Sequence, residues 1–388
     1  MPTFYNFKQD GNTHSFDDVF IPVDAFRQGN LWTWGRNVFG QAGTNDTSYK
    51  STPVTTLSGG SNWKQVECGY QHSLAIKTDG TLWTWGYGAN LQLGTGDNQE
   101  RRTPVQVFGN HTNWKQVSVG VYVTAAIKTD GTLWVWGEGS YGGLGTNDTT
   151  SRATPVTTFA GGTNWKQVST GALAFSAIKT DGTLWTWGLN DYGALGTNDT
   201  ATRSTPVTTF AGGTNWKQVA CGEYHFSAIK TDGTLWTWGS NGAGELGIND
   251  TTHRSTPVTT FAGGTNWKQS SNGFGHTTAI KTDGTLWTWG TNYAGGLGTN
   301  DTTNRATPVT TIAGGTNWKK VHSGNGSNAA IKTDGTLWTW GYNSFASLGI
   351  NDHFNRSTPV TTFAGGTNWK SVAIHYQTLA IEYIDPVL

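Results

Sequence analysis

The sequence predicts an all-β fold, a seven-bladed β-propeller of 51-residue repeats, and three observations support this prediction. The first is a Leu-Trp-(Thr or Val)-Trp-Gly string that occurs seven times at a constant interval of 51 residues. The second is a series of short strand patterns inside each repeat. The third is that the two ends of the chain complement each other. The string begins at Leu31, Leu82, Leu133, Leu184, Leu235, Leu286 and Leu337, and an Asn-Trp-Lys string recurs at the same interval from Asn62 to Asn368.

The repeat that starts at Asn62 shows the expected order of elements. Residues 63–66 are short and β-prone, and residues 73–77 are apolar enough for a buried strand. The Thr-Asp-Gly sequence at 78–80 is typical of a hairpin turn, because its glycine tolerates positive φ. Residues 81–85 alternate in side-chain type, and residues 103–107 contain a proline, which suits an outer edge strand. Three to four strands in each of seven repeats is typical of a propeller.

The ends of the chain predict a closed ring. The first repeat begins at its third strand, residues 31–35, and the last repeat stops after its second strand, residues 379–383. Pairing of these strands would leave no open sheet edge and would place both termini at one end of the blade. The final repeat is one residue short. Residues 31–388 therefore form the predicted propeller, and the apolar leader, residues 1–30, is a predicted docking segment for a larger assembly.

Composition narrows the classes of partner and location. Charged residues make up 13% of the chain and the formal net charge is zero, which gives no general attraction to nucleic acid or anionic membranes. We expect no membrane insertion, because no apolar run approaches the roughly 20 residues that a membrane helix needs. Residues 1–12 are polar and lack the apolar stretch of a signal peptide. We therefore expect synthesis in the cytoplasm, with a virion as one further location.

All 21 tryptophans lie at repeat positions, three in each unit, which favours packing between blades over a ligand cage. Most lysines and arginines also recur with the repeat. They include Lys64, Lys77 and Lys50 with their equivalents, and we expect them to pair with repeated acids such as Asp46 and Asp79.

Successive turns of an antiparallel sheet fall at opposite ends, which defines two faces. The turn at 69–72 and the loop after Gly86 share one end, and the Thr-Asp-Gly turns lie at the other. The copies differ mainly at the first end, which we call the top face. Relaxed drift of solvent loops would also produce such variation, but exposed aromatic side chains favour binding. The candidate binding residues are Arg36, Phe39, Tyr70, Tyr87, Tyr122, Glu138, Tyr141, Asp191, Tyr192, Glu223, Tyr224, Phe274, Tyr293, Tyr342 and Phe345.

The ring should bring some of these aromatic residues together. Tyr141 and Tyr192 fall on adjacent blades, and closure makes Phe39 and Phe345 neighbours. Acidic residues on the top face outnumber the basic residue Arg36: they are Glu138, Asp191, Glu223 and Glu245. Such a locally acidic surface makes nucleic acid an unfavourable partner.

Signals for catalysis, metals and cofactors are weak, so the sequence predicts a non-enzymatic protein without a cofactor. His72, His225 and His276 share one register and are interpreted as turn residues that satisfy backbone groups; no Cys/His pair has zinc spacing. Cys68 and Cys221 lie three blades apart, too far for a disulfide.

The sequence at 66–76, followed by Asp79-Gly80, Trp85-Gly86 and Leu93-Gly94, resembles the repeat of the regulator-of-chromosome-condensation family. The resemblance covers residues 31–383 and implies the propeller fold. Members include a guanine-nucleotide exchange factor, bacterial effectors and a β-lactamase-inhibitor protein. The strict spacing leaves no room for the wedge that exchange implies in this family. The regular Thr/Asn-rich repeats and residues 16–22 also resemble repeat proteins of tailed bacteriophages.

These resemblances leave three functions open. One is a phage virion appendage, such as a tail fibre, whose variable face recognises a host surface glycan or another virion protein. The second is an intracellular propeller that binds or inhibits one protein. The third is a purely structural decoration protein.

Overall fold

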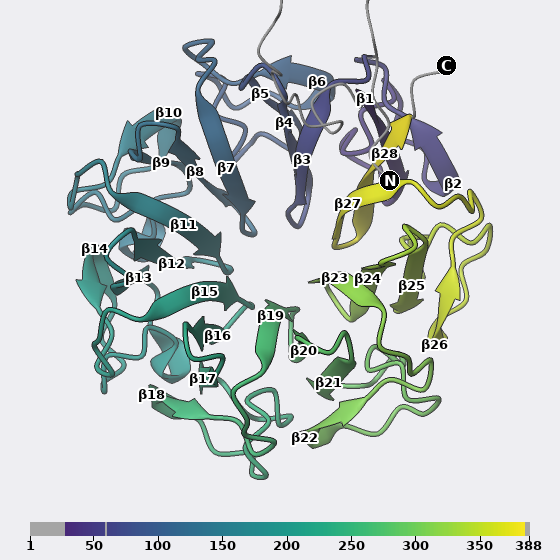
Figure 1. Cartoon of the computed structure of the whole chain (residues 1–388). Coiled ribbons are helices and arrows are strands. Elements are labelled where there is room, and N and C mark those ends of the chain that lie inside the picture. Colours follow the sequence, from purple (N-terminus) through teal and green to yellow (C-terminus); the bar gives the residue numbers. More distant parts are fainter. Residues whose placement is uncertain (1–27, 59, 385–388) are drawn as a thin grey trace, which may run out of the picture.

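The computed structural model describes residues 28–384 apart from residue 59, and it consists of seven four-stranded antiparallel sheets arranged in a ring (Figure 1). The prediction of a seven-bladed all-β propeller is confirmed. Each sheet contains, from the centre outward, an inner, a second, a third and an outer strand.

The inner strands are β3 (Trp63–Cys68), β7 (Trp114–Val119), β11 (Trp165–Thr170), β15 (Trp216–Cys221), β19 (Trp267–Asn272), β23 (Trp318–Ser323) and β27 (Trp369–Ile374). The second strands are β4 (His72–Lys77), β8 (Val123–Lys128), β12 (Ala174–Lys179), β16 (His225–Lys230), β20 (His276–Lys281), β24 (Ser327–Lys332) and β28 (Gln377–Ile384). The third strands are β5 (Leu82–Gly86), β9 (Leu133–Gly137), β13 (Leu184–Gly188), β17 (Leu235–Gly239), β21 (Leu286–Gly290), β25 (Leu337–Gly341) and β1 (Gln28–Gly35). The outer strands are β6 (Arg101–Gln106), β10 (Arg152–Thr157), β14 (Arg203–Thr208), β18 (Arg254–Thr259), β22 (Arg305–Thr310), β26 (Arg356–Thr361) and β2 (Lys50–Thr55). Two 3-10 turns are η2 (Ser140–Gly142) and η3 (Asp191–Gly193).

The two ends of the chain close the ring as predicted. The closing sheet has the order β2-β1-β28-β27, so it takes its two outer strands from the start of the chain and its two inner strands from the end. Leu31 pairs with Ile381 and Gly35 pairs with Gln377 along β1 and β28. The closing blade, which we call the seam, therefore ties both ends of the chain into one hydrogen-bonded sheet.

The core consists of apolar clusters that each join two neighbouring blades. One of them combines Leu31 and Leu379 of the seam with Trp63 and Trp85 of the next blade. The Trp85 indole nitrogen also donates to the Gln41 carbonyl oxygen of the seam at 2.8 Å. Both tryptophans are almost completely buried. The repeated tryptophans thus hold adjacent blades together, in agreement with the architectural interpretation.

The repeated charges divide into two groups. Lys50 contacts Asp46 at 2.7 Å, and six equivalent arginine–aspartate pairs occur on the other blades. The predicted pairing of Lys77 with Asp79 is corrected, because the Lys77 ammonium lies over the rings of Trp63 and Trp83, at 4.6 and 4.4 Å from their centroids. Asp79 instead accepts hydrogen bonds from Thr81. Cation–π contact with two rings therefore replaces the expected ion pair.

The described ends of the chain lie at the end of the seam opposite the pair Gly35–Gln377, where Gln28 pairs with Ile384. Residues 1–27 lie outside the described residues, so the proposed docking role of residues 1–30 rests on sequence alone; residues 28–30 already belong to β1. No helix in the described part of the chain is long and apolar enough to cross a membrane.

Candidate binding face

The top face is built by the turns between inner and second strands and by the loops between third and outer strands. The two are connected, because the Tyr87 amide in the loop donates to the Gln71 carbonyl oxygen in the turn at 2.9 Å. At the other end of the blade, the Trp114 amide of the next inner strand donates to Gly80 of the Thr-Asp-Gly turn at 3.0 Å. The turn and the variable loop therefore share one face, as the sequence predicts.

Buried asparagines fix the shape of the top loops. The Asn37 amide nitrogen donates to both an oxygen of the Asp46 side chain (2.9 Å) and the Ser48 carbonyl (3.1 Å). Its side-chain oxygen accepts from the Ala42 amide at 2.8 Å. Asn190, Asn241, Asn292 and Asn343 make corresponding contacts on other blades. Side chains on these loops are therefore presented by a preorganised backbone.

Aromatic side chains gather around one cation at the seam. The Arg36 guanidinium lies 5.2 Å from the Phe345 ring centroid, 5.6 Å from Tyr376, 5.8 Å from Tyr70 and 6.0 Å from Phe39. Each of these side chains remains partly exposed. Since Phe39 and Phe345 both lie against Arg36, the predicted meeting of these residues through ring closure is observed.

Further rings extend this group along the face. Tyr342 lies 5.8 Å from Phe345, Tyr293 lies 6.3 Å from Tyr342, and Tyr87 lies 4.7 Å from Phe39. We call Arg36, Phe39, Tyr70, Tyr342, Phe345 and Tyr376 the seam cluster. It contains aromatic and arginine side chains, the types that dominate protein interfaces.

Tyr376 was missed by the sequence reasoning. It lies in a turn that is one residue shorter than its equivalents: the His375 amide donates to Gln377, whereas the Gly324 amide of the preceding blade donates to Ser327. The shorter turn still aligns Tyr376 with the top face, and the Arg36 amide donates to its carbonyl oxygen at 2.9 Å. The signal was available, because Tyr376 follows Asn325 by one repeat length.

A second aromatic pair projects from 3-10 turns on neighbouring blades. Tyr141 is 55% exposed and Tyr192 is 48% exposed. Both have φ of 59°, a left-handed conformation that bulky residues rarely adopt. Tyr192 contacts the rings of Tyr224 and His253, at 5.9 and 4.7 Å, rather than that of Tyr141. Tyr141 and Tyr192 therefore lie on adjacent blades as predicted, but their rings do not contact each other.

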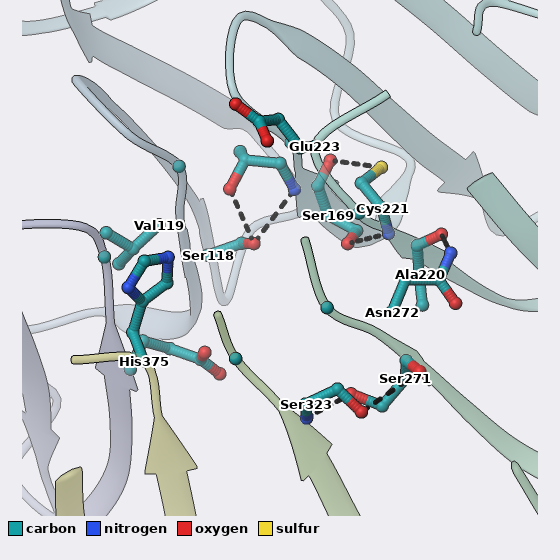
Figure 2. A pocket seen from close by; sticks show the side chains of 18 of the residues that line it. Ser118, Val119, Ser169, Ala220, Cys221, Glu223, Ser271, Asn272, Ser323 and His375 are labelled. Carbon is teal, nitrogen blue, oxygen red and sulfur yellow. Dashed lines mark hydrogen bonds between the residues drawn. The ribbon is translucent and has the colours of Figure 1, made fainter. Parts of the chain in front are cut away.

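The inner strands surround a central cavity of about 600 Å³ (Figure 2). Glutamines on five of the seven inner strands lie along these edges and form what we call the glutamine ring, while Lys320 and Ser371 occupy the same position on β23 and β27. The Gln167 amide nitrogen donates to the Val219 carbonyl on the next blade at 2.9 Å, and its oxygen accepts from the Val219 amide at 3.2 Å. Gln116, Gln218 and Gln269 repeat this double contact. Exposed strand edges are satisfied in this way, and the channel wall stays polar.

Five of the candidate residues line the mouth of this cavity: Tyr70, Tyr122, Glu223, Tyr224 and Phe274. Figure 2 shows Glu223 among the lining side chains, together with the serines of the inner strands. Burial raises the pKa of Glu223 to about 7. Glu138, which lies on an outer loop, is 3.5 Å from the Asn90 amide nitrogen, and Asp191 begins η3.

The prediction that Glu245 adds to an acidic top face is wrong. Glu245 is 5% exposed, and its carboxylate accepts from the Ser240 hydroxyl (2.7 Å) and the Ala243 amide (2.8 Å). It therefore stabilises a loop and offers little charge to a partner.

The three histidines link blades rather than only completing turns. The imidazole of His72 contacts the Thr124 hydroxyl of the next blade at 3.2 Å, and His225 contacts Thr277 at 2.9 Å. Burial lowers the pKa of His72 to about 3 and that of His225 to about 4. Within the described ranges no group of three His, Cys, Asp or Glu side chains could hold a metal. Cys68 and Cys221 are free and buried.

A ring of exposed apolar residues was also missed. The second residue after each outer strand is 57–66% exposed. The sequence shows an apolar residue at a constant position, but exposure depends on how the next blade packs. The ring consists of Leu57, Phe108, Phe159, Phe210, Phe261, Ile312 and Phe363.

Comparisons with known proteins agree with this architecture. The family description "Regulator of chromosome condensation (RCC1) repeat" matches residues 28–76, 79–127, 130–173, 181–229, 232–280 and 283–331. The ultraviolet-B receptor UVR8 of Arabidopsis thaliana is 32% identical over 284 residues, which is 72% of this chain and 64% of the receptor. The chain thus spans slightly less than two thirds of that relative.

Two solved structures share the fold at low identity. Yeast RCC1 (Prp20), solved bound to Kap60, has a TM-score of 0.82 and 16% identity, with 100% of this chain and 97% of that chain covered. Human WBSCR16 has a TM-score of 0.79 and 20% identity, with 92% and 99% covered. With six matched repeats across most of its length, this chain belongs to the regulator of chromosome condensation (RCC1) repeat family.

Proposed function

We propose that this chain is a non-catalytic binding propeller that captures a protein partner on its top face, with the seam cluster at the centre of the contact. The observation that carries the proposal is the Arg36 guanidinium among four partly exposed aromatic rings. Such side chains supply most of the free energy at protein interfaces, because they bury large areas with few rotatable bonds.

Preorganisation supports the same proposal. The seam cluster lies on loops whose backbone is fixed by buried asparagines such as Asn37 and Asn343. Little conformational entropy is then lost when a partner binds.

The names of relatives favour a protein as the partner. Yeast RCC1 was solved bound to Kap60, and a second study of Prp20p concerns its binding to Gsp1p and histones. Recognition of a surface glycan by a virion appendage is the second candidate, because tyrosine and phenylalanine faces also stack on sugar rings. This second candidate rests on the sequence alone.

The test compares two triple variants of the purified chain. The first changes Arg36, Phe345 and Tyr376 to alanine, and the matched control changes the exposed Phe159, Phe210 and Phe261 of the apolar ring to alanine. Both are checked for native circular dichroism and then used in quantitative affinity capture with cell extract and on a glycan array.

We expect one saturable protein partner that wild type and control retain and the seam variant loses by at least tenfold. Equal capture by all three proteins contradicts the proposal. Loss of a glycan signal, without any protein partner, supports the glycan candidate instead.

A further inference from the structure

Glu223 carries a carboxylate oxygen that the fold leaves unused. The residue lies in the turn between β15 and β16 and lines the central cavity. Its Oε2 atom is buried and accepts no hydrogen bond within the described residues. Burial outweighs the favourable effect of the neighbouring Tyr224 and raises the pKa of Glu223. Because a buried carboxylate oxygen without a partner is costly, such an arrangement points to a ligand that completes it.

The cavity wall offers no cation of its own to this carboxylate. Its lining, as far as the structure describes it, includes Glu67, Glu223, His322 and His375 but neither lysine nor arginine. Glu67 is already engaged by His322, whose Nε2 lies 3.5 Å from the carboxylate. Since His322 Nδ1 accepts from the Ile374 amide, Nε2 carries the proton in the neutral ring. Glu223 therefore has no lysine or arginine partner among the described residues that line the cavity.

Aromatic residues of the top turns line the same cavity as Glu223. Tyr122, Tyr224 and Phe274 line the mouth from three different blades, and Phe274 is 52% exposed. Ring faces attract a cation, and the Glu223 carboxylate would neutralise it. A cavity of about 600 Å³ has room for a long side chain.

We infer that the cavity mouth is a receptor for a lysine side chain that the partner protein inserts from the top face. The inference rests on the proposed function, and it adds the chemistry by which the partner is recognised. The ammonium group donates to Glu223 and to neighbouring hydroxyls, while the four-carbon stem lies along the aromatic rim. A divalent metal is disfavoured because the described residues provide no group of three ligands.

The test uses n-butylammonium as a probe of the lysine side chain, with n-butanol as the uncharged control. Binding to the full chain is followed by saturation-transfer NMR and by the side-chain resonances of ¹³C-labelled glutamates. Three proteins are compared: wild type, Glu223→Gln, and Glu100→Gln, which removes an acid that pairs with Arg102 on the surface. Circular dichroism confirms that each variant is folded.

We expect saturable binding of butylammonium that perturbs the Glu223 resonance, persists in Glu100→Gln and weakens at least tenfold in Glu223→Gln. Butanol should bind more weakly than butylammonium. Absence of butylammonium binding, or equal binding by wild type and Glu223→Gln, overturns the inference. Because the probe binds without a partner protein, absence of probe binding does not affect the proposal that the seam cluster captures a protein. Likewise, failure to capture a protein does not affect the inferred lysine receptor.

Discussion

The glutamine ring of the inner strands makes a quantitative prediction about the stability of the propeller. Gln167→Ala removes two hydrogen bonds between β11 and β15, one to the Val219 carbonyl and one from the Val219 amide. At about 1 kcal/mol each, and with cavity water able to replace part of the loss, the free energy of unfolding should fall by about 1–2 kcal/mol. Gln65→Ala is the matched control for hydrogen exchange, because Gln65 donates to the Val117 carbonyl and to Glu67 Oε1 of its own strand, but the Val117 amide does not donate to it.

Two measurements check this prediction. Urea unfolding gives the change in free energy for both variants, and hydrogen exchange reports the individual amides. The Val219 amide points away from its own sheet toward Gln167, so its exchange should accelerate in Gln167→Ala. The Val117 amide should be unchanged in Gln65→Ala. Unaltered exchange at Val219, or an unchanged free energy of unfolding in Gln167→Ala, would refute the view that glutamines cap the inner edges.

Three further predictions follow from buried groups and from breaks in the repeat. Lys320→Gln should raise the free energy of unfolding in urea by up to about 1 kcal/mol. Lysine interrupts the glutamine ring at β23, and its ammonium group only donates to the Lys370 carbonyl oxygen. An unchanged free energy of unfolding would count against a stabilising role of the ring. Burial lowers the pKa of His72 to about 3, so the unfolded chain takes up the proton first and stability falls as pH drops below about 6.5. The variant His72→Gln introduces the residue that Gln377 provides at the same register of the seam. Between pH 6.5 and 5 it should lose about 2 kcal/mol less stability than wild type. The two proteins are compared at each pH, so that the effects of other titrating groups such as Glu223 cancel. Burial raises the pKa of Cys221 to about 12 and also raises the pKa of Cys68. Neither thiol should therefore react with Ellman's reagent until guanidinium unfolds the chain. Rapid reaction of the folded protein in buffer would contradict this burial.

The repeat made the fold predictable in detail. A constant period fixes the number of blades, and the complementary ends at residues 31–35 and 379–383 fix the closure, which the pairing of Leu31 with Ile381 confirms. Small differences remain at strand boundaries: β3 continues to Cys68, and β6 begins at Arg101 rather than at residue 103. Boundaries depend on which backbone groups find partners across the sheet, and side-chain patterns report this only indirectly.

The candidate site was less predictable, because burial of a loop residue is decided by the neighbouring blade. Glu245 looks like a surface acid in sequence, yet loop donors enclose it. Lys77 looks like a partner for Asp79, yet two tryptophan rings lie beneath its ammonium. The exposed phenylalanine that follows most outer strands, such as Phe159, looks like a core residue. Each error concerns contacts between elements that are distant in sequence, which local patterns do not contain.

The seam explains why aromatic residues gather in one place on an otherwise regular ring. In six blades a glycine occupies the turn after the inner strand, and at Gly69 a side chain would come within 2.6 Å of the Gly120 carbonyl oxygen on the next blade. At the seam this glycine is replaced by His375, and the turn is one residue shorter. Because β1 and β28 come from opposite ends of the chain, the seam is also the one blade whose turn and variable loop belong to different copies of the repeat. Tyr376 and Arg36 could therefore diverge without disturbing an intact repeat, and their backbone hydrogen bond brings both to the same point of the top face. A partner that contacts one side of the ring would thus meet its strongest contacts where the repeat is interrupted.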